Sequence, residues 1–261
     1  KRSVGNFLVR GLIKGGFQGD VTVVNPKYDS VEGLPSVASL RDLPQAPDLA
    51  VLSVSSHRME AMMKEAIEVG AKSAVVFDFC LFEGDSEPVL LQRLKDMARE
   101  ANFPVCGGSG MGYHNFDTKT LVSFQDPVCT KPGHITGLCH SGSVFGMLAD
   151  AAGRYGFNLL TSQGQEINGS LAEYMDYALD QPTTRVLALF VEAIREPERF
   201  IAALEKSKRK GIPVVATKVG RTAVSARLAA THSGAMAGDD TAFDAVCRRY
   251  GVLRTDDLDG L

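Results

Sequence analysis

The stretch HITGLCHSGSVFGMLADAAGRYGFNLLT, residues 134–161, carries the clearest structural signal in the chain. Its two ends, His134–Cys139 and Phe157–Thr161, are mostly apolar runs with the length of a buried strand. Between them, over Ser143–Gly153, apolar residues recur at the three-to-four-residue spacing of a helix. A strand, a helix and a second strand in this order predict a βαβ unit with parallel strands.

The same alternation continues to the C-terminal end of the sequence. The further elements that we expect are a helix over Ser170–Leu179, a strand over Arg185–Val191, a helix over Glu198–Lys210, a strand over Pro213–Thr217, a helix over Asp239–Tyr250 and a strand over Val252–Arg254. Repeated βα units build an open parallel sheet with helices on both faces. The second half of the chain is therefore predicted to be a doubly wound α/β domain.

The first half alternates in the same way but opens with a helix. The expected elements are a helix over Lys1–Gly16 and strands over Val21–Asn25, Leu49–Val54, Ser73–Phe77 and Phe103–Cys106, with helices between the last three strands. In nucleotide-binding folds a strand comes first and leads into a glycine-rich phosphate loop. The sequence therefore predicts a first domain that is truncated at its N-terminus and lacks this loop.

Glycine and proline interrupt the pattern between Gly107 and Gly133. We expect a first domain over residues 1–119, a linker over 120–132 and a second domain over 133–261. A chain of 261 residues suits two domains, at about 150 residues per domain. The predicted fold class is α/β, with two doubly wound parallel-sheet domains.

Composition excludes several classes of protein. Lys and Arg number 28 against 31 Asp and Glu, and the charges form no long run, which argues against a nucleic-acid-binding protein. No stretch approaches the roughly 18 apolar residues of a membrane span. The five cysteines are odd in number and lack CxxC spacing, and with five scattered histidines they make no zinc pattern. We interpret them as reduced thiols of a cytoplasmic protein.

The candidate sites are the turns that follow the predicted strands, because ligands of open parallel sheets bind beyond the carboxyl ends of the strands. Ser141, Gly142 and Ser143 follow a strand and begin a helix, whose unpaired N–H groups can receive a phosphate. The alternative is an ordinary serine cap. Glu192 closes another strand, where a carboxylate serves either catalysis or solvation.

One histidine, His232, lies among small residues in the loop Ala229–Gly238. A core histidine would need bulky neighbours, whereas small neighbours let a ligand approach the imidazole, so the pattern favours a functional role. Two other histidines are less informative. His140 adjoins the predicted phosphate-binding turn, and His114 is interpreted as a loop residue.

In the first domain, polar residues follow two predicted strands. Asn25 and Lys27 come after the first strand, and Ser55 comes after the second. A nucleotide would lie at these strand ends, where Lys27 is available to a phosphate. Plain turn chemistry is the alternative explanation.

Several segments, in their order along the chain, resemble the NDP-forming acyl-CoA synthetase family, which is related to the succinyl-CoA synthetase alpha subunit. The matching segments are VVNPKY (23–28), LRDLPQAPDLAV (40–51), HSGS (140–143), THSGAMAGDD (231–240) and GVLRTDDL (251–258). The resemblance covers essentially the whole chain. Its most specific part is the loop around residue 232 together with the final segment.

The resemblance implies a Rossmann-like CoA-binding domain followed by a flavodoxin-like, succinyl-CoA-ligase-like domain. It implies that His232 is phosphorylated by ATP and that Glu192 contacts this histidine. It also implies that Ser141, Gly142 and Ser143 hold the phosphoryl group. The activity would be that of an ADP-forming acid–CoA ligase, which passes the phosphoryl group to a carboxylic acid before CoA displaces phosphate.

The CoA site implied by the resemblance lies at the strand ends of the first domain. Asn25, Lys27 and Ser55 are the expected contacts, and the segment Phe77, Asp78 and Phe79 lies where the family's CoA-contacting strand end would be.

Many members of the family carry Asn-Cys in a glycine-rich run where this sequence has Ser109-Gly110.

The same resemblance implies the partners of the chain. An ATP-grasp unit, on this chain or on another, would bind ATP and Mg²⁺, and the acid itself cannot be named from the sequence. We expect an oligomer in the cytoplasm, without nucleic-acid or membrane partners.

Two other functions are open at this point. A CoA-sensing regulatory module, as in proteins that fuse this architecture to an acetyltransferase, would need neither His232 nor Glu192, and both are present. An NAD-dependent oxidoreductase would rest on fold analogy alone. It would also need a dinucleotide fingerprint followed by an acidic residue, which this sequence lacks.

Overall fold

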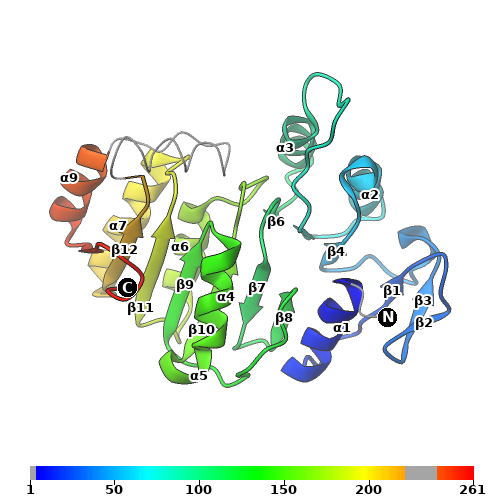
Figure 1. Cartoon of the computed structure of the whole chain (residues 1–261), viewed down its shortest axis with the longest axis horizontal. Helices are drawn as coiled ribbons and strands as arrows, with labels where there is room; N and C mark the ends of the chain where they lie inside the picture. The colour runs from blue at the N-terminus through cyan, green and yellow to red at the C-terminus, as the bar shows by residue number, and fades with distance from the viewer. Residues whose placement is uncertain (1–3, 221–239) are drawn as a thin grey trace.

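Seven strands form the larger of the sheets in this computed structural model, which describes residues 4–220 and 240–261 (Figure 1). Their order is β13-β12-β11-β9-β10-β7-β8. The bounds are β7 Gly112–Asn115, β8 Thr120–Ser123, β9 Ile135–Cys139, β10 Phe157–Ser162, β11 Val186–Val191, β12 Val214–Lys218 and β13 Leu253–Thr255. The five strands from β9 to β13 pair in parallel, whereas β7 and β8 are antiparallel.

Helices cover both faces of this sheet, as the sequence predicts. On one face lie α6 (Leu171–Asp180), α7 (Pro197–Lys210) and α9 (Asp240–Tyr250), whose apolar side chains share one core with the strands. On the other face lie α4 (Gly142–Asp150) and α5 (Ala152–Tyr155), which share a second core. The order of the five parallel strands is that of flavodoxin-like folds. The prediction of a doubly wound domain is therefore confirmed.

Burial on both faces explains why these strands were recognisable. All six residues of β10 are buried, and five of the six in β11 are buried. A strand with helices over both faces needs a continuous apolar run rather than an alternating one.

The hairpin of β7 and β8 differs from the expectation for this part of the chain. Residues 120–123 of the segment expected as a linker form β8, and residues 124–134 hold neither helix nor strand. His114, interpreted from sequence as a loop residue, lies in β7. It is buried, its Nε2 lies 2.7 Å from the Ser123 hydroxyl, and burial lowers its pKa to about 4. Two four-residue strands that contain glycine and polar residues give too short a pattern to detect.

The first domain has its own parallel sheet, of β4 (Ala50–Leu52), β5 (Ala74–Val76) and β6 (Val105–Gly107). The connections between these strands are α2 (Ser56–Glu68) and α3 (Leu90–Glu100), which pack on the sheet through Met59, Met63, Leu90 and Leu94. These βαβ connections match the predicted alternation.

A small separate sheet precedes β4, in the order β1-β3-β2. It consists of β1 (Val23–Val24), β2 (Ser30–Val31) and β3 (Leu34–Val37), of which only β1 was expected. Glu32 and Gly33 join β2 to β3 with positive φ angles of 49° and 83°, as a two-residue hairpin turn of type I′ requires. The N-terminal helix α1 (Val4–Gly15) packs against β8 rather than on this sheet.

At one point of the domain junction, two backbone segments cross without side chains between them. Residues 165–168 lie along β6: the Val105 N–H donates to the Asn168 carbonyl at 2.8 Å, and the Ile167 N–H donates to the Gly107 carbonyl at 2.9 Å. A Cβ atom on Gly110 would lie 2.4 Å from the Ser162 carbonyl oxygen. A Cβ atom on Gly164 would lie 2.1 Å from the Gly108 carbonyl oxygen. Both contacts are with backbone, which cannot rotate away.

Within residues 4–220 and 240–261, the model contains no helix with the length and apolar character needed to cross a membrane.

Gly164→Ala tests the backbone crossing at the domain junction. Gly164 has φ of +57°, so alanine there meets both left-handed strain and a collision with backbone, and we expect a loss of at least about 3 kcal/mol in the free energy of unfolding. Gly211→Ala is the matched control, because Gly211 has φ of +66° but nothing within 4 Å of the added Cβ, and should lose about 1–2 kcal/mol. Urea unfolding measures both, and equal losses would contradict the crossing.

Candidate functional site

Two of the predicted site segments meet at the topological switch point of the larger sheet. Strands β9 and β11 are neighbours there, although they are not consecutive in the chain. Ser141 follows β9, and Glu192 follows β11. Ligands of doubly wound sheets bind in the crevice outside the carboxyl ends of the strands at this point. The fold thus brings both predicted segments to the same edge.

Helix α4 begins at Gly142, one residue before the expected start at Ser143. Ser141 is its N-cap, and the Ser141 Oγ accepts a hydrogen bond from the Val144 N–H at 3.4 Å. The first N–H groups and the positive end of the helix dipole therefore face the carboxyl edge of the sheet. A Cβ atom on Gly142 would lie 2.7 Å from the Met111 Cγ, so the glycine lets this side chain lie close to the start of the helix.

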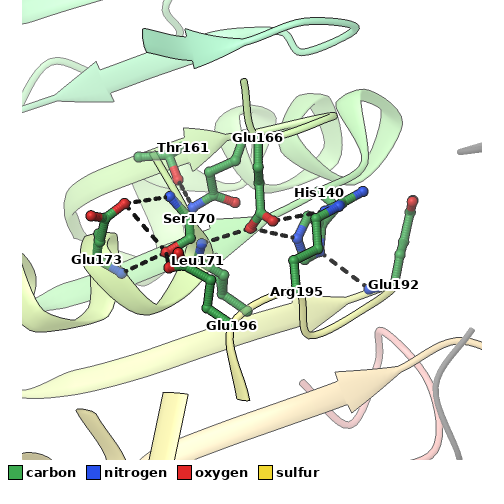
Figure 2. Close-up of polar contacts among 10 residues, drawn as sticks. His140, Thr161, Glu166, Ser170, Leu171, Glu173, Glu192, Arg195 and Glu196 are labelled. Atoms are coloured by element: carbon green, nitrogen blue, oxygen red, sulfur yellow. Dashed lines mark hydrogen bonds and ion pairs between the residues drawn. The ribbon is translucent and has the colours of Figure 1, made fainter. Parts of the chain in front are cut away.

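Glu192 is half-buried, and its backbone and side chain have different surroundings. Its N–H donates to the Nδ1 of His140 at 3.2 Å. Its carboxylate has no hydrogen bond to another described residue, and Figure 2 shows it pointing away from Glu166.

Sequence reasoning missed the buried residue on which this arrangement depends, Glu166. One of its oxygens, Oε1, lies 3.1 Å from the Nε2 of His140 and accepts from the Leu171 N–H at 2.6 Å. The other, Oε2, accepts from the Arg195 guanidinium at 2.8 Å. The side chains of His140 and Glu166 are 0% and 4% exposed. Figure 2 shows this group of contacts at the edge of the sheet.

These partners decide the ionisation of Glu166. Burial alone would raise the pKa of its carboxyl, but the hydrogen bond from His140 and the charge of Arg195 outweigh burial and lower this pKa below its ordinary value. Glu166 is therefore a buried carboxylate anion.

The start of α6 extends the same polar group. Ser170 is the N-cap of α6 and forms a capping box with Glu173. Its hydroxyl also donates to the Glu196 carboxylate at 2.5 Å. The sequence signal for the box is present, since serine is followed three residues later by glutamate before an apolar run.

One further buried cation lies at this edge. Lys218 ends β12 and is paired in register with Val191, the residue before Glu192. It is 3% exposed, and its Nζ donates to the Val219 carbonyl at 3.1 Å. The predicted nucleophile His232 lies outside the described residues.

The first-domain candidates lie on turns. The Lys27 N–H donates to the Asn25 Oδ1 at 3.0 Å, which fixes the turn after β1 and leaves the Lys27 side chain exposed. Ser55 is exposed at the N-cap position of α2, and its side chain makes no capping hydrogen bond there. Asn25 and Ser55 thus follow β1 and β4, as the sequence predicts.

The segment after β5 divides into buried and exposed parts. Phe77 is 6% exposed and packs against Phe124 with tilted rings whose centroids are 4.2 Å apart, so it belongs to the core. Phe79 is 68% exposed. Asp78 accepts hydrogen bonds from the Ser56 hydroxyl and from the Cys80 N–H, which ties β5 to the start of α2. Among the three, Phe79 is the side chain open to a ligand.

Among the described residues, no group of three or more His, Cys, Asp and Glu side chains is placed to hold a metal ion.

Comparison with known proteins identifies two domain families. Residues 1–115 match the model of a CoA binding domain, and residues 132–261 match that of a succinyl-CoA ligase like flavodoxin domain. These limits leave 116–131 between them.

Curated relatives match over almost the whole chain. An ADP-forming acetate–CoA ligase II of Archaeoglobus fulgidus is 27% identical over 97% of this chain and 38% of its own length. A trans-feruloyl-CoA synthase of an unknown prokaryotic organism is 29% identical over 100% of this chain and 38% of its own length. The alpha subunit of the ADP-forming acetate–CoA ligase I of Pyrococcus furiosus is 26% identical, over 96% of this chain and 55% of the subunit. The chain thus spans less than two thirds of each relative.

A solved structure has the same fold. The dinucleotide forming acetyl-coenzyme A synthetase 1 of Ca. Korarchaeum cryptofilum, in complex with phosphate and ADP, aligns with a TM-score of 0.89 and 26% identity. The alignment covers 98% of this chain and 56% of that one.

A pair of serine variants tests the cap at the start of α4. Ser141→Ala removes the acceptor for the Val144 N–H and should cost about 0.5–1 kcal/mol in the free energy of unfolding, since the bond is long. Ser143→Ala changes an exposed residue in the first turn and should stay within about 0.5 kcal/mol. Chemical denaturation compares them, and a larger loss for Ser143→Ala would refute the assignment of the cap.

Proposed function

Because the chain belongs to the NDP-forming acyl-CoA synthetase family, which joins a CoA binding domain to a succinyl-CoA ligase like flavodoxin domain, we propose that it is the CoA-binding and ligase part of an ADP-forming acid–CoA ligase. The proposed reaction converts a carboxylate, CoA and ATP into acyl-CoA, ADP and phosphate. The observation that carries it is the meeting of Ser141 and Glu192 at the switch point of the ligase-like sheet.

The phosphoryl group would travel through His232. In the first step a ring nitrogen of this histidine attacks the γ-phosphorus of ATP, and the bond to the ADP oxygen breaks. In the second step the substrate carboxylate takes the phosphoryl group from the imidazole. A neutral imidazole is nucleophilic near neutral pH, and its phosphorylated form is a good donor. The Glu192 carboxylate, which has no other described partner, would orient the ring and stabilise its positive charge.

The start of α4 would bind the transferred group. Its first N–H groups, together with Ser141 and Ser143, offer donors at the positive end of a nine-residue helix. Gly142 adds no side chain of its own to this end, where the Met111 side chain lies close by. The sulfur of CoA would then attack the acyl carbon of the acyl phosphate formed in the second step, and inorganic phosphate would leave.

CoA would lie along the strand ends of the first domain. Asn25, Lys27 and Ser55 supply polar groups on turns after β1 and β4, and Asp78 and Phe79 follow β5. The exposed ammonium of Lys27 suits a phosphate of CoA. Phe77 would support the segment from the core rather than touch the ligand.

An ATP-grasp unit would supply ATP and Mg²⁺. The sequence of this chain holds no GxxxxGK[ST] loop, so ATP would be bound mainly by that unit. The Pyrococcus relative is named as an alpha subunit, which supports an assembly of more than one unit and an oligomer. Five unpaired cysteines support a reducing compartment such as the cytoplasm.

The regulatory alternative, a CoA-sensing module, is not favoured. The relatives that match over most of the chain are named as ligases and synthases. The nature of the acid stays open, because those names include both acetate and a feruloyl group.

Phosphorylation of His232 tests the proposal in the complete protein with its ATP-grasp unit. Labelled ATP should give an acid-labile, base-stable phosphoprotein that the cognate acid plus CoA, or ADP alone, discharges. His232→Ala should abolish the label, and Glu192→Gln should slow its formation by roughly tenfold. The matched control is His134→Ala. His134 is exposed and precedes β9, so it lies at the amino-terminal ends of the strands, whereas the site lies at their carboxyl ends.

Two outcomes would overturn the proposed function. Full labelling of His232→Ala would exclude this histidine as the carrier. Release of AMP and pyrophosphate by the wild-type protein would indicate an acyl-adenylate route, which needs no phosphohistidine.

Calorimetry of CoA binding tests the first domain separately. Lys27→Ala should weaken the affinity about tenfold, the equivalent of one charged hydrogen bond. Lys72→Ala is the control, because Lys72 is also exposed but precedes β5 at the other end of the strands and pairs with Asp48 at 2.7 Å. Unchanged affinity in Lys27→Ala would remove Lys27 from the site.

A further inference from the structure

One buried carboxylate holds both ends of the turn that carries Glu192. The Glu166 Oε2 binds the Arg195 guanidinium directly at 2.8 Å. The Glu166 Oε1 contacts His140 at 3.1 Å, and His140 in turn contacts the Glu192 N–H at 3.2 Å. The turn over residues 192–195 is thus tied to Glu166 at its first and its last residue (Figure 2).

The two contacts of His140 fix the position of its proton. The Glu192 N–H is a donor, so the Nδ1 of His140 must be the acceptor. The Nε2 must then carry the proton and donate it to the Glu166 carboxylate. The Nε2–H tautomer of neutral imidazole satisfies both neighbours. Any other form would place two N–H groups face to face at Glu192.

Glu166 itself is anchored from the opposite side. Its Oε1 accepts the Leu171 N–H at the first residue of α6, and its own backbone has a positive φ of 52°. The carboxylate is therefore fixed by α6 on one side and reaches the turn after β11 on the other. Burying a charged group and an imidazole is costly, and apolar residues of the same volume would often be at least as stable. The arrangement is better explained by the geometry that it imposes.

We propose that Glu166 and His140 are positioning residues that aim the Glu192 carboxylate at the phosphoryl-transfer centre. This inference rests on the proposed function, because it takes Glu192 as the group that acts on the phosphorylated histidine. Glu166 and His140 act through the backbone of the turn over residues 192–195 and touch no substrate. Misplacing a reacting group by about an ångström can cost on the order of a hundredfold in rate, so a positional role predicts a large effect on turnover.

Substitutions that keep the shape and change the hydrogen bonding separate this role from simple stabilisation. In Glu166→Gln, the amide nitrogen must face either Arg195 or the proton of His140, so one end of the turn loses its contact. His140→Leu removes the acceptor for the Glu192 N–H and fills the site with apolar atoms. His140→Gln restores an acceptor for Glu192 and a donor for Glu166, and serves as the rescue variant.

The experiment uses the complete ligase with its ATP-grasp unit and measures kcat, the KM for CoA and for the acid, the rate of phosphoenzyme formation and the thermal midpoint. Glu166→Gln and His140→Leu should lower kcat and the phosphorylation rate ten- to hundredfold, with the KM for CoA changed by less than about twofold. His140→Gln should recover kcat to within about threefold of wild type. Glu173→Gln, a carboxylate of the same helix start without a link to Glu192, should behave as wild type because glutamine also completes a capping box.

Turnover at the wild-type rate in His140→Leu would overturn the inference. So would equal losses in His140→Leu and His140→Gln. If Glu166→Gln fails to fold, the comparison of the two His140 variants still decides the question, because both keep the Glu166 carboxylate and its contact with Arg195. A wild-type protein that produces no ADP from ATP, acid and CoA would refute the proposed function instead.

Discussion

The crossing of two peptide backbones at the domain junction is the constraint on which the rest of the structure depends. Residues 107–110 leave the first sheet and pass against residues 162–168, which leave the second. Because the two segments touch backbone to backbone, side chains are excluded at Gly110 and Gly164, and backbone hydrogen bonds join the two segments directly. The same crossing fixes the path of residues 163–166, and therefore the place from which Glu166 reaches the switch point of the larger sheet.

Two carboxylates at that switch point differ in their exposure to water. Glu166 is removed from solvent and satisfied by three donors, so it is rigid and anionic. Glu192 is half-buried and keeps its carboxylate without a described partner. A fully hydrogen-bonded carboxylate such as Glu166 can hold the backbone of a site in place. A neighbouring carboxylate without a described partner, such as Glu192, can then act on a reacting group. The cost of burying Glu166 is offset by its three contacts, one of which, from the Leu171 N–H, is at the first residue of α6.

Much of the fold could be read from the sequence because strands buried on both faces have a distinctive composition. The runs around β9, β10 and β11 are apolar and long enough to be unambiguous, and the turns after them located Ser141 and Glu192. The β2–β3 and β7–β8 hairpins could not be predicted from the sequence, because their strands have two to four residues and mix polar with apolar side chains. Glu166 was not predicted for a different reason. The segment Ser162–Glu166 is polar and contains glycine, which is typical of a solvated turn, whereas in the structure Glu166 is buried and bonded to His140, Leu171 and Arg195, which come from other segments of the chain.

The pairing of residues 165–168 with β6 also bears on how the chain is made. Until residue 168 has left the ribosome, β6 is an open edge of the first sheet, with the Val105 N–H and the Gly107 carbonyl unpaired. An open edge can pair with a neighbouring nascent chain. The N-terminal domain therefore has an unpaired strand edge during synthesis until about sixty residues after β6 have been made.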